Sequence, residues 1–236
     1  MNMKCLSIIT LIFAIAFAVF FMAPPFLTKQ FGFYPLMKVG DVFDIFTPLV
    51  LIPLYWLLFR LNVDKAPSLT GILTFLLFVT LWVAGQSMHL AANSIGHLLN
   101  EMEGSDAYRL TYFYDEFLSH YMWHLGIFGL SAIVLIRQLI NPFTENQAIS
   151  WIMILAGIIH GFTLFVIVIE AGTALLGMTY VIVVTLFCLI WGWKRFSYQP
   201  LLLFFFVTCL VATMFFIGWG AYWGGLPEFS EVGIID

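Results

Sequence analysis

Residues 200–223 read PLLLFFFVTCLVATMFFIGWGAYW, without one charged residue or histidine. This stretch is apolar on every side rather than alternately apolar and polar. A helix that crosses a membrane needs about 20 mostly apolar residues. A β-strand that crosses one needs about 10 residues of alternating polarity. The stretch therefore predicts a transmembrane helix and argues against a β-barrel.

The composition of the whole chain extends this prediction. The 236 residues are 62% hydrophobic and 9% charged, with a mean hydropathy of +1.02. A soluble domain carries about 25% charged residues, so that class is excluded. We expect an all-α membrane helical bundle formed by residues 1–236 as a single transmembrane domain, its first apolar segment retained as a helix. Seven segments are long and apolar enough to span: 5–23, 43–60, 69–99, 111–138, 149–170, 174–193 and 200–223.

The charges indicate the surroundings of this bundle. The nine Lys and Arg residues form no basic cluster that could bind nucleic acid. The expected partner is therefore the lipid bilayer. In a prokaryote this bilayer is the cell membrane. Positive residues favour the cytoplasmic side, which predicts a cytoplasmic N-terminus and an outside C-terminus. Six lie in the expected inner loops and three in the outer ones: Lys4, Arg60, Lys65, Arg137, Lys194 and Arg195 against Lys29, Lys38 and Arg109.

All five histidines fall inside predicted spans, where ionisable side chains are costly and usually functional. His89, Asn93 and His97 recur every four residues in the third span, so they share one helical face. The fourth span contains polar residues at the same spacing. A short connection near residues 101–110 makes the two spans antiparallel neighbours.

Glu116, His120 and His124 form the second stripe of polar residues at the same spacing. Counting from a turn near residue 105 places His89 at the depth of His120. His160 in the fifth span is expected at the depth of His124. These polar groups therefore converge in the outer half of the bundle.

Histidines with a nearby carboxylate suit zinc, iron or copper, and two histidines one helical turn apart can hold one ion. We predict a divalent metal site in which Glu116 or Asp115 acts as the catalytic base. The metal ligands are expected to be His89, His120, His124 and His160. The supporting and rim residues are expected to be Asn93, His97, Ser119 and Glu170.

Three functions are compatible with this pattern. The first is a metal-dependent hydrolase that acts on a lipid or another hydrophobic small molecule. The second is a redox protein with iron, copper or haem b, the haem held by His89 with His120 or by His124 with His160. The third is an ion carrier or sensor without enzymatic activity, which would use the same histidines in neutral and protonated forms.

The segment 119–124, SHYMWH, resembles the His-x-x-x-His segment of the CREST superfamily of membrane hydrolases and receptors. The resemblance implies seven spans and an intramembrane zinc site for hydrolysis of lipid amides. It covers about six residues. In that family the histidine pair belongs to the last span, whereas here it belongs to the fourth. The last span here, 200–223, has no histidine.

Overall fold

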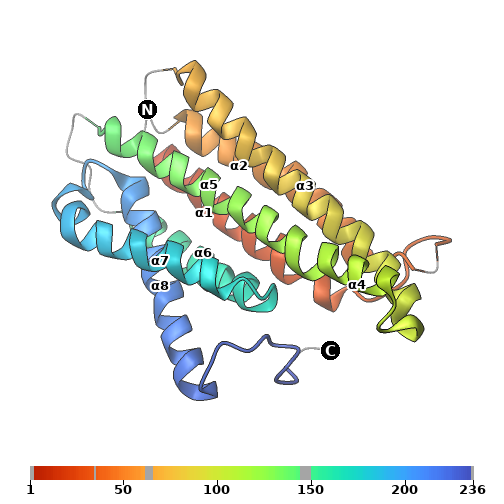
Figure 1. The fold of residues 1–236 in the computed structure, drawn as a ribbon. Helices are drawn as coiled ribbons and strands as arrows, with labels where there is room; N and C mark the ends of the chain where they lie inside the picture. Colours follow the sequence, from red (N-terminus) through yellow and green to blue (C-terminus); the bar gives the residue numbers. More distant parts are fainter. Residues whose placement is uncertain (1–2, 35, 62–65, 144–149, 235–236) are drawn as a thin grey trace.

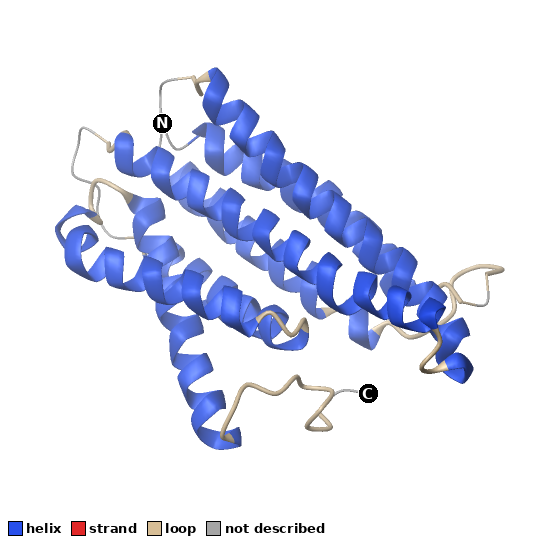
Figure 2. Cartoon of the chain, viewed as in Figure 1, coloured by secondary structure: helices blue, strands red, loops and turns tan. Residues whose placement is uncertain are grey.

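A computed structural model describes residues 3–34, 36–61, 66–143 and 150–234. Figures 1 and 2 show helices joined by loops, and the β-type pairing in this described part is an isolated bridge between Gln30 and Lys38. The α-helices are α1 Met3–Met22, α2 Val39–Leu61, α3 Leu69–Leu99, α4 Asp106–Tyr112, α5 His120–Ile140, α6 Trp151–Glu170, α7 Ala174–Phe187 and α8 Pro200–Trp223. Shorter helical segments are η1 Pro24–Phe26, η2 Asn100–Met102, η3 Phe113–Ser119, η4 Cys188–Gly192 and η5 Trp193–Arg195.

The prediction of seven spans and an all-α class is confirmed. Seven helical stretches in the described residues are long and apolar enough to cross a membrane. The fourth stretch begins at Asp106 rather than at residue 111, because α4, η3 and α5 continue one another. Two details of the prediction lie outside the described residues, namely residue 149 as the start of the fifth span and the position of Lys65.

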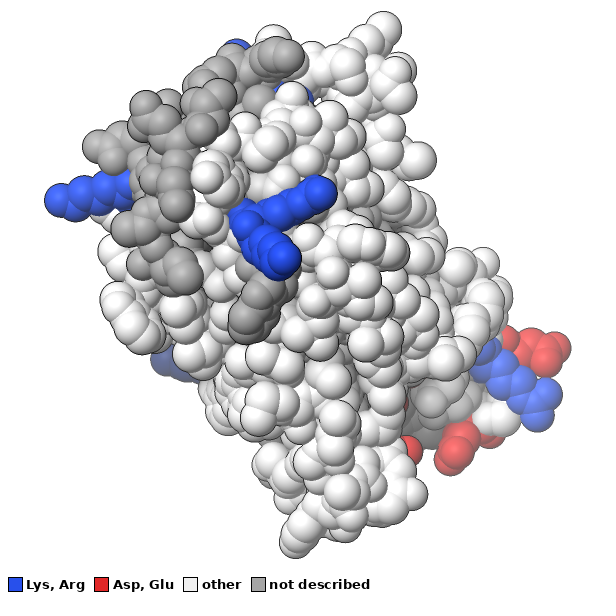
Figure 3. Space-filling view, turned by 90° about the vertical axis from the view of Figure 1, so that its left-hand side faces the viewer, with Lys and Arg blue, Asp and Glu red and all other residues white. Residues whose placement is uncertain are grey.

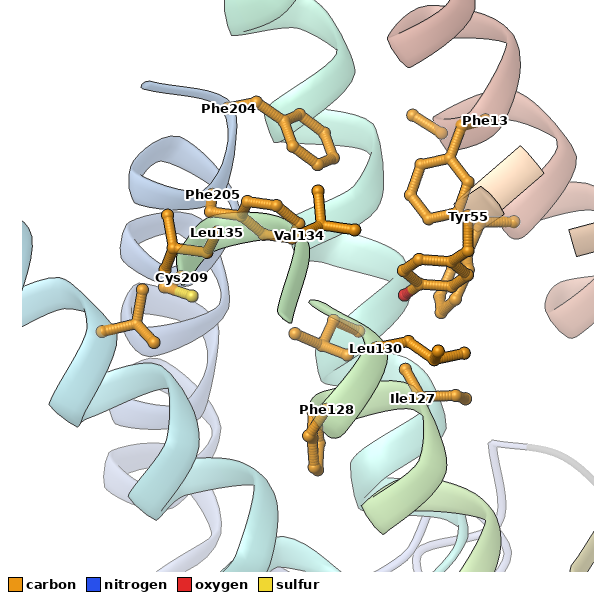
Figure 4. Close-up of a cluster of buried hydrophobic side chains, with 14 of the residues drawn as sticks. Phe13, Tyr55, Ile127, Phe128, Leu130, Val134, Leu135, Phe204, Phe205 and Cys209 are labelled. Atoms are coloured by element: carbon orange, nitrogen blue, oxygen red, sulfur yellow. The ribbon is translucent and has the colours of Figure 1, made fainter. Parts of the chain in front are cut away.

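Helix α5 lies in the middle of the bundle. In Figure 4, Phe13 and Tyr55 approach it from one side, and Phe204, Phe205 and Cys209 of α8 lie on the other. The hydroxyl of Tyr55 in α2 lies 2.9 Å from that of Ser131 in α5, so the two polar groups satisfy each other inside the apolar bundle. The part of α5 between Ile127 and Leu135 is therefore packed from both sides.

Glycines bring α3 and α5 into backbone contact. A methyl group added at Gly85 would lie 2.5 Å from the backbone nitrogen of Trp123 and 2.6 Å from the carbonyl oxygen of Ser119. One added at Gly126 would lie 2.7 Å from the backbone nitrogen of Trp82. Only a hydrogen atom fits at either position. Because lipid tails are as apolar as leucine, membrane helices associate through this kind of close packing.

A second glycine pair joins α6 to α8. A methyl group at Gly157 would lie 2.9 Å from the carbonyl oxygen of Phe204, and Gly161 faces the carbonyl oxygen of Thr208. Glycines four residues apart lie on one face of a helix, which is the usual spacing of close contacts in membranes. The two glycine contacts thus fix α5 and α6, the helices that carry His120, His124 and His160.

The N-terminus and the C-terminal segment lie at opposite ends of the bundle (Figure 1). We call the end where α2, α4 and α7 begin the acidic end. The acidic side chains visible in Figure 3 gather there, beside a broad uncharged surface. After α8, residues 224–234 return across this end, below α6 and α1 in the view of Figure 1. This arrangement leaves the middle of the bundle free of charge, as a bilayer requires.

Substitution of Gly85 by alanine should destabilise the protein, because α3 and α5 must separate to admit the new methyl group. Overpacking of this kind costs about 1–3 kcal/mol. Gly218→Ala in α8 is the matched control, since no atom lies within 4 Å of a methyl group at that position. Thermal unfolding in one detergent should give a lower midpoint for Gly85→Ala and an unchanged midpoint for Gly218→Ala. Equal midpoints for the two variants would show that the contact is dispensable.

Candidate functional site

His89 and His120 face each other one helical turn beyond the Gly85 contact. Their ring centroids are 4.8 Å apart, so the predicted equal depth of these two histidines is confirmed. Trp123 packs against both rings, at 5.8 Å from His89 and 5.4 Å from His120. The backbone contact between α3 and α5 thus places two imidazoles side by side.

Asp115 is the carboxylate that approaches His89. Its Oδ1 lies 2.8 Å from Nδ1 of His89, an ion-pair distance, although the two atoms are poorly aligned for a hydrogen bond. Asp115 is buried, and a polar partner such as His89 offsets the cost of removing a polar side chain from water. The pairing differs from the sequence pattern, in which Glu116 was expected on the histidine stripe.

A π-helical segment explains the difference. Residues Phe113–Ser119 form η3, whose wider turns rotate the preceding side chains relative to a continuous α-helix. Asp115 then points to His89, while Oε2 of Glu116 stays 3.9 Å from Nδ1 of His120. Inside η3, the hydroxyl of Ser119 donates to the carbonyl oxygen of Asp115. Single π-helical turns occur frequently at functional sites.

His120 and His124 each donate a hydrogen bond from Nδ1 to a carbonyl oxygen. For His120 the acceptor is Ala171 at 3.1 Å, and for His124 it is His120 itself at 3.0 Å. A carbonyl oxygen can only accept, so each neutral ring carries its hydrogen on Nδ1 and a lone pair on Nε2. Nε2 of His124 is buried without a partner in the described structure, and Oγ1 of Thr173 lies 3.2 Å from Nδ1 of the same ring.

His160 lies in a different environment. Its ring packs 5.2 Å from Phe13, 4.4 Å from Phe17 and 5.3 Å from Phe204, measured between centroids. Both of its nitrogens are buried without a partner among the described residues. None of the described contacts joins His160 to the other histidines. Of the two histidine pairs predicted for haem, the structure therefore brings together His89 with His120.

The predicted metal site is not assembled in this structure. In the part of the chain that is described, no three His, Cys, Asp or Glu side chains gather closely enough to hold one metal ion. Structural and catalytic metal sites use at least three protein ligands as a rule. What the structure brings together is two histidines, each beside a carboxylate.

A cavity of about 560 Å³ lies at the acidic end. His89, His120 and Glu116 line it, together with Asn93 and Glu170, two of the residues predicted to support the metal site. Asp41, Asp44 and Glu228 contribute further carboxylates. The apolar part of the lining includes Phe21, Met22, Phe26, Trp123, Phe162, Val166, Ile167, Phe229 and Ile234. The cavity is therefore amphipathic, as pockets for small molecules commonly are.

A smaller cavity of about 220 Å³ adjoins the first. His97 lines it together with Tyr112, and Asn93 and Glu116 line both cavities. His97 thus lies at the rim of the histidine pair rather than inside it, as the spacing along α3 predicted.

The C-terminal segment forms one wall of the larger cavity. The backbone nitrogen of Phe229 donates to Oε2 of Glu170 at 3.2 Å, and Nε1 of Trp219 donates to the carbonyl oxygen of Pro227 at 3.0 Å. The ring of Phe229 packs on Phe165 and Trp219. These contacts hold the segment against α6 and α8.

Two parts of this site could not be predicted from the sequence. One is the C-terminal segment with Glu228, which carries no periodic pattern. The other is Thr173, which sits in the turn between α6 and α7 beside His124. The sequence does contain a signal for the close approach of α3 to α5. Gly85 lies four residues before His89 and therefore on the same helical face.

The helices define an integral, multi-pass membrane protein. Over 146 residues the chain is 25% identical to ceroid-lipofuscinosis neuronal protein 6 of Homo sapiens, a likeness that includes 50% of this chain and 43% of the human protein. The chain thus spans less than half of the curated relative that it matches. No family model matches the sequence, and no solved structure matches the fold.

The docking of the C-terminal segment should depend on pH. Burial, together with the nearby Glu116, Glu231 and Glu170, raises the pKa of Glu228 to about 7 from its ordinary 4.5. The docked segment therefore binds the proton more tightly than a detached one does. Docking should be strongest below pH 4.5 and should weaken as the pH rises through about 7.

Hydrogen exchange of residues 224–234, corrected for the intrinsic pH dependence of exchange, measures this docking. Protection should fall between pH 5 and pH 8 in the unmodified protein and stay constant in Glu228→Gln. Protection that increases with pH would contradict the assignment.

Proposed function

We propose that the protein binds a hydrophobic small molecule, such as a lipid, in the cavity at its acidic end. The observation that carries this proposal is the division of the cavity lining. One part is apolar, with Phe21 and Phe162, and the other holds His89, His120 and Glu116. A molecule with a hydrocarbon chain and a polar head group matches such a division.

The edge of the cavity supports entry from the bilayer. Phe26 and Phe162 line the cavity, and they are also 74% and 37% exposed. Side chains that are exposed on an apolar surface of this kind face lipid in a membrane. A ligand dissolved in the bilayer therefore meets the cavity beside these two rings without passing through water.

We also propose that the whole chain forms a single membrane domain with a cytoplasmic N-terminus and an outside C-terminus. The count of Lys and Arg residues supports this orientation. In this orientation the cavity opens near the outer leaflet. The acidic end, with its carboxylates, then faces the outside.

Filling the cavity tests the main proposal. Val166 in α6 lines the cavity, and Val166→Trp places a large ring in it. Ile158→Trp is the matched control on the same helix, at a side chain that is 45% exposed. A spin-labelled single-chain lipid with a neutral head group should bind the control as it binds the unmodified protein, with the broadening of its spectrum as the readout. Val166→Trp should weaken binding about tenfold or more, because the ligand must compete with the ring for space. Unchanged binding in Val166→Trp would place the lipid elsewhere.

A second candidate is a metal-dependent hydrolase. What supports it is the orientation of the imidazoles, because metal-binding histidines usually donate their other nitrogen to a carboxylate or a carbonyl group. His120 donates to Ala171, and His89 lies against Asp115. In this proposal His89, His120 and His124, whose Nε2 has no partner in the described structure, draw together round zinc, iron or copper, and Glu116 is the base. A bound zinc ion would supply an acidified water for hydrolysis.

Metal analysis of the purified protein separates the two candidates. If the hydrolase proposal is right, the protein contains about one equivalent of a single metal, and His120→Ala abolishes it. His160→Phe should keep the metal, because His160 packs among phenylalanine rings. Full metal content in His120→Ala would refute the metal site and leave the binding proposal intact.

A further inference from the structure

We propose that the head group of the bound molecule is a cationic amine, so that the ligand is a single-chain amphiphile with a protonated amino group. This inference rests on the proposed function, because it names the chemical class of the ligand in the same cavity. It follows from the charges of the lining, from their spacing and from the aromatic wall beside them.

Acidic side chains outnumber basic ones around the cavity. Among the described residues that line it, the only Lys or Arg is Lys38. The carboxylates number five and come from four parts of the chain: Asp41, Asp44, Glu116, Glu170 and Glu228. Carboxylates that face one cavity repel one another, and a cation between them removes this repulsion.

Some of these carboxylates already have backbone partners, and others do not. Oδ2 of Asp41 accepts from the backbone nitrogen of Lys38 at 2.7 Å, and Glu170 accepts from Phe229. Asp44 interacts electrostatically with His89 and Asp41, but no described hydrogen bond reaches its carboxylate. Asp44 and Glu228 are therefore the acids best placed to pair with a ligand.

The spacing of the acids favours an organic cation over a metal ion at this position. The acids are distributed around a cavity of about 560 Å³, and no three described ligand side chains gather closely enough for one metal ion. A compact ion needs oxygen ligands within about 2–2.6 Å. A protonated amine is satisfied by fewer partners, and its hydrocarbon chain fills the apolar remainder.

The aromatic wall supplies the second, independent observation. Phe21 and Trp123 stack at 5.6 Å with an angle of 11° between their planes, and both line the cavity. Trp123 is 9% exposed, and its indole nitrogen has no hydrogen-bond partner in the described structure. A buried N–H group in the cavity wall needs an acceptor, and an oxygen atom of the ligand next to the amine would supply one.

Three spin-labelled amphiphiles with one chain length test the inference on the full-length protein in a neutral detergent. Their head groups are an amine, an alcohol and a carboxylate. The amine should bind about tenfold more tightly than the alcohol, and the carboxylate should bind most weakly. Added salt should reduce the preference for the amine, since part of it is electrostatic.

The double variant Asp44→Asn/Glu228→Gln should lose the preference while it keeps its affinity for the alcohol, which also shows that the cavity is still folded. Glu103→Gln/Asp106→Asn removes the same charge from exposed residues that do not line the cavity, and it should keep the preference. If the double variant does not fold, Glu228→Gln alone takes its place, and it should lose a smaller part of the preference for the amine.

The outcomes separate the two proposals. Equal affinity for amine and alcohol overturns the cationic head group and leaves the proposed function standing. Absence of binding for all three amphiphiles overturns the proposed function itself. A preference that survives in the Asp44 and Glu228 variants shows that these acids do not select the ligand, and the inference fails.

Discussion

The contact between Gly85 and the backbone of α5 is the constraint on which the site depends. In water, apolar side chains drive helices together, but in a bilayer the lipid offers the same apolar surroundings. Helices must then gain their stability from atoms in close contact. At Gly85, the α3 backbone lies against Ser119 and Trp123 without an intervening side chain. One turn further along α3, His89 therefore reaches His120.

The π-helical segment before α5 has the complementary effect. It lets two adjacent acids, Asp115 and Glu116, serve two different histidines. A regular α-helix would direct consecutive side chains about 100° apart and would align only one of them with the stripe. The local departure from α-helical geometry therefore sets the arrangement of acids and imidazoles. The packing of α5, which is buried from both sides, offsets the free-energy cost of the π-helical turn.

The sequence was sufficient for the features that depend on local pattern. Long apolar runs such as 200–223 predicted the seven spans, and the distance from a single turn predicted that His89 and His120 meet. Features that depend on distant contacts were not predicted. Glu116 was placed on the stripe because periodicity assumes a regular helix. His160 was expected to join the other histidines at the depth of His124, but its ring packs among phenylalanine rings instead. The predicted roles in metal binding and catalysis stay predictions.

The return of residues 224–234 to the acidic end also affects what can be attached to this protein. Ile234 lines the cavity, so a group attached to a cysteine introduced at position 234 is tethered beside the binding space. A short tether of this kind gives an attached ligand a local concentration in the millimolar range, by the general behaviour of flexible linkers. The N-terminus lies at the opposite end of the bundle, and a group attached there has no such access.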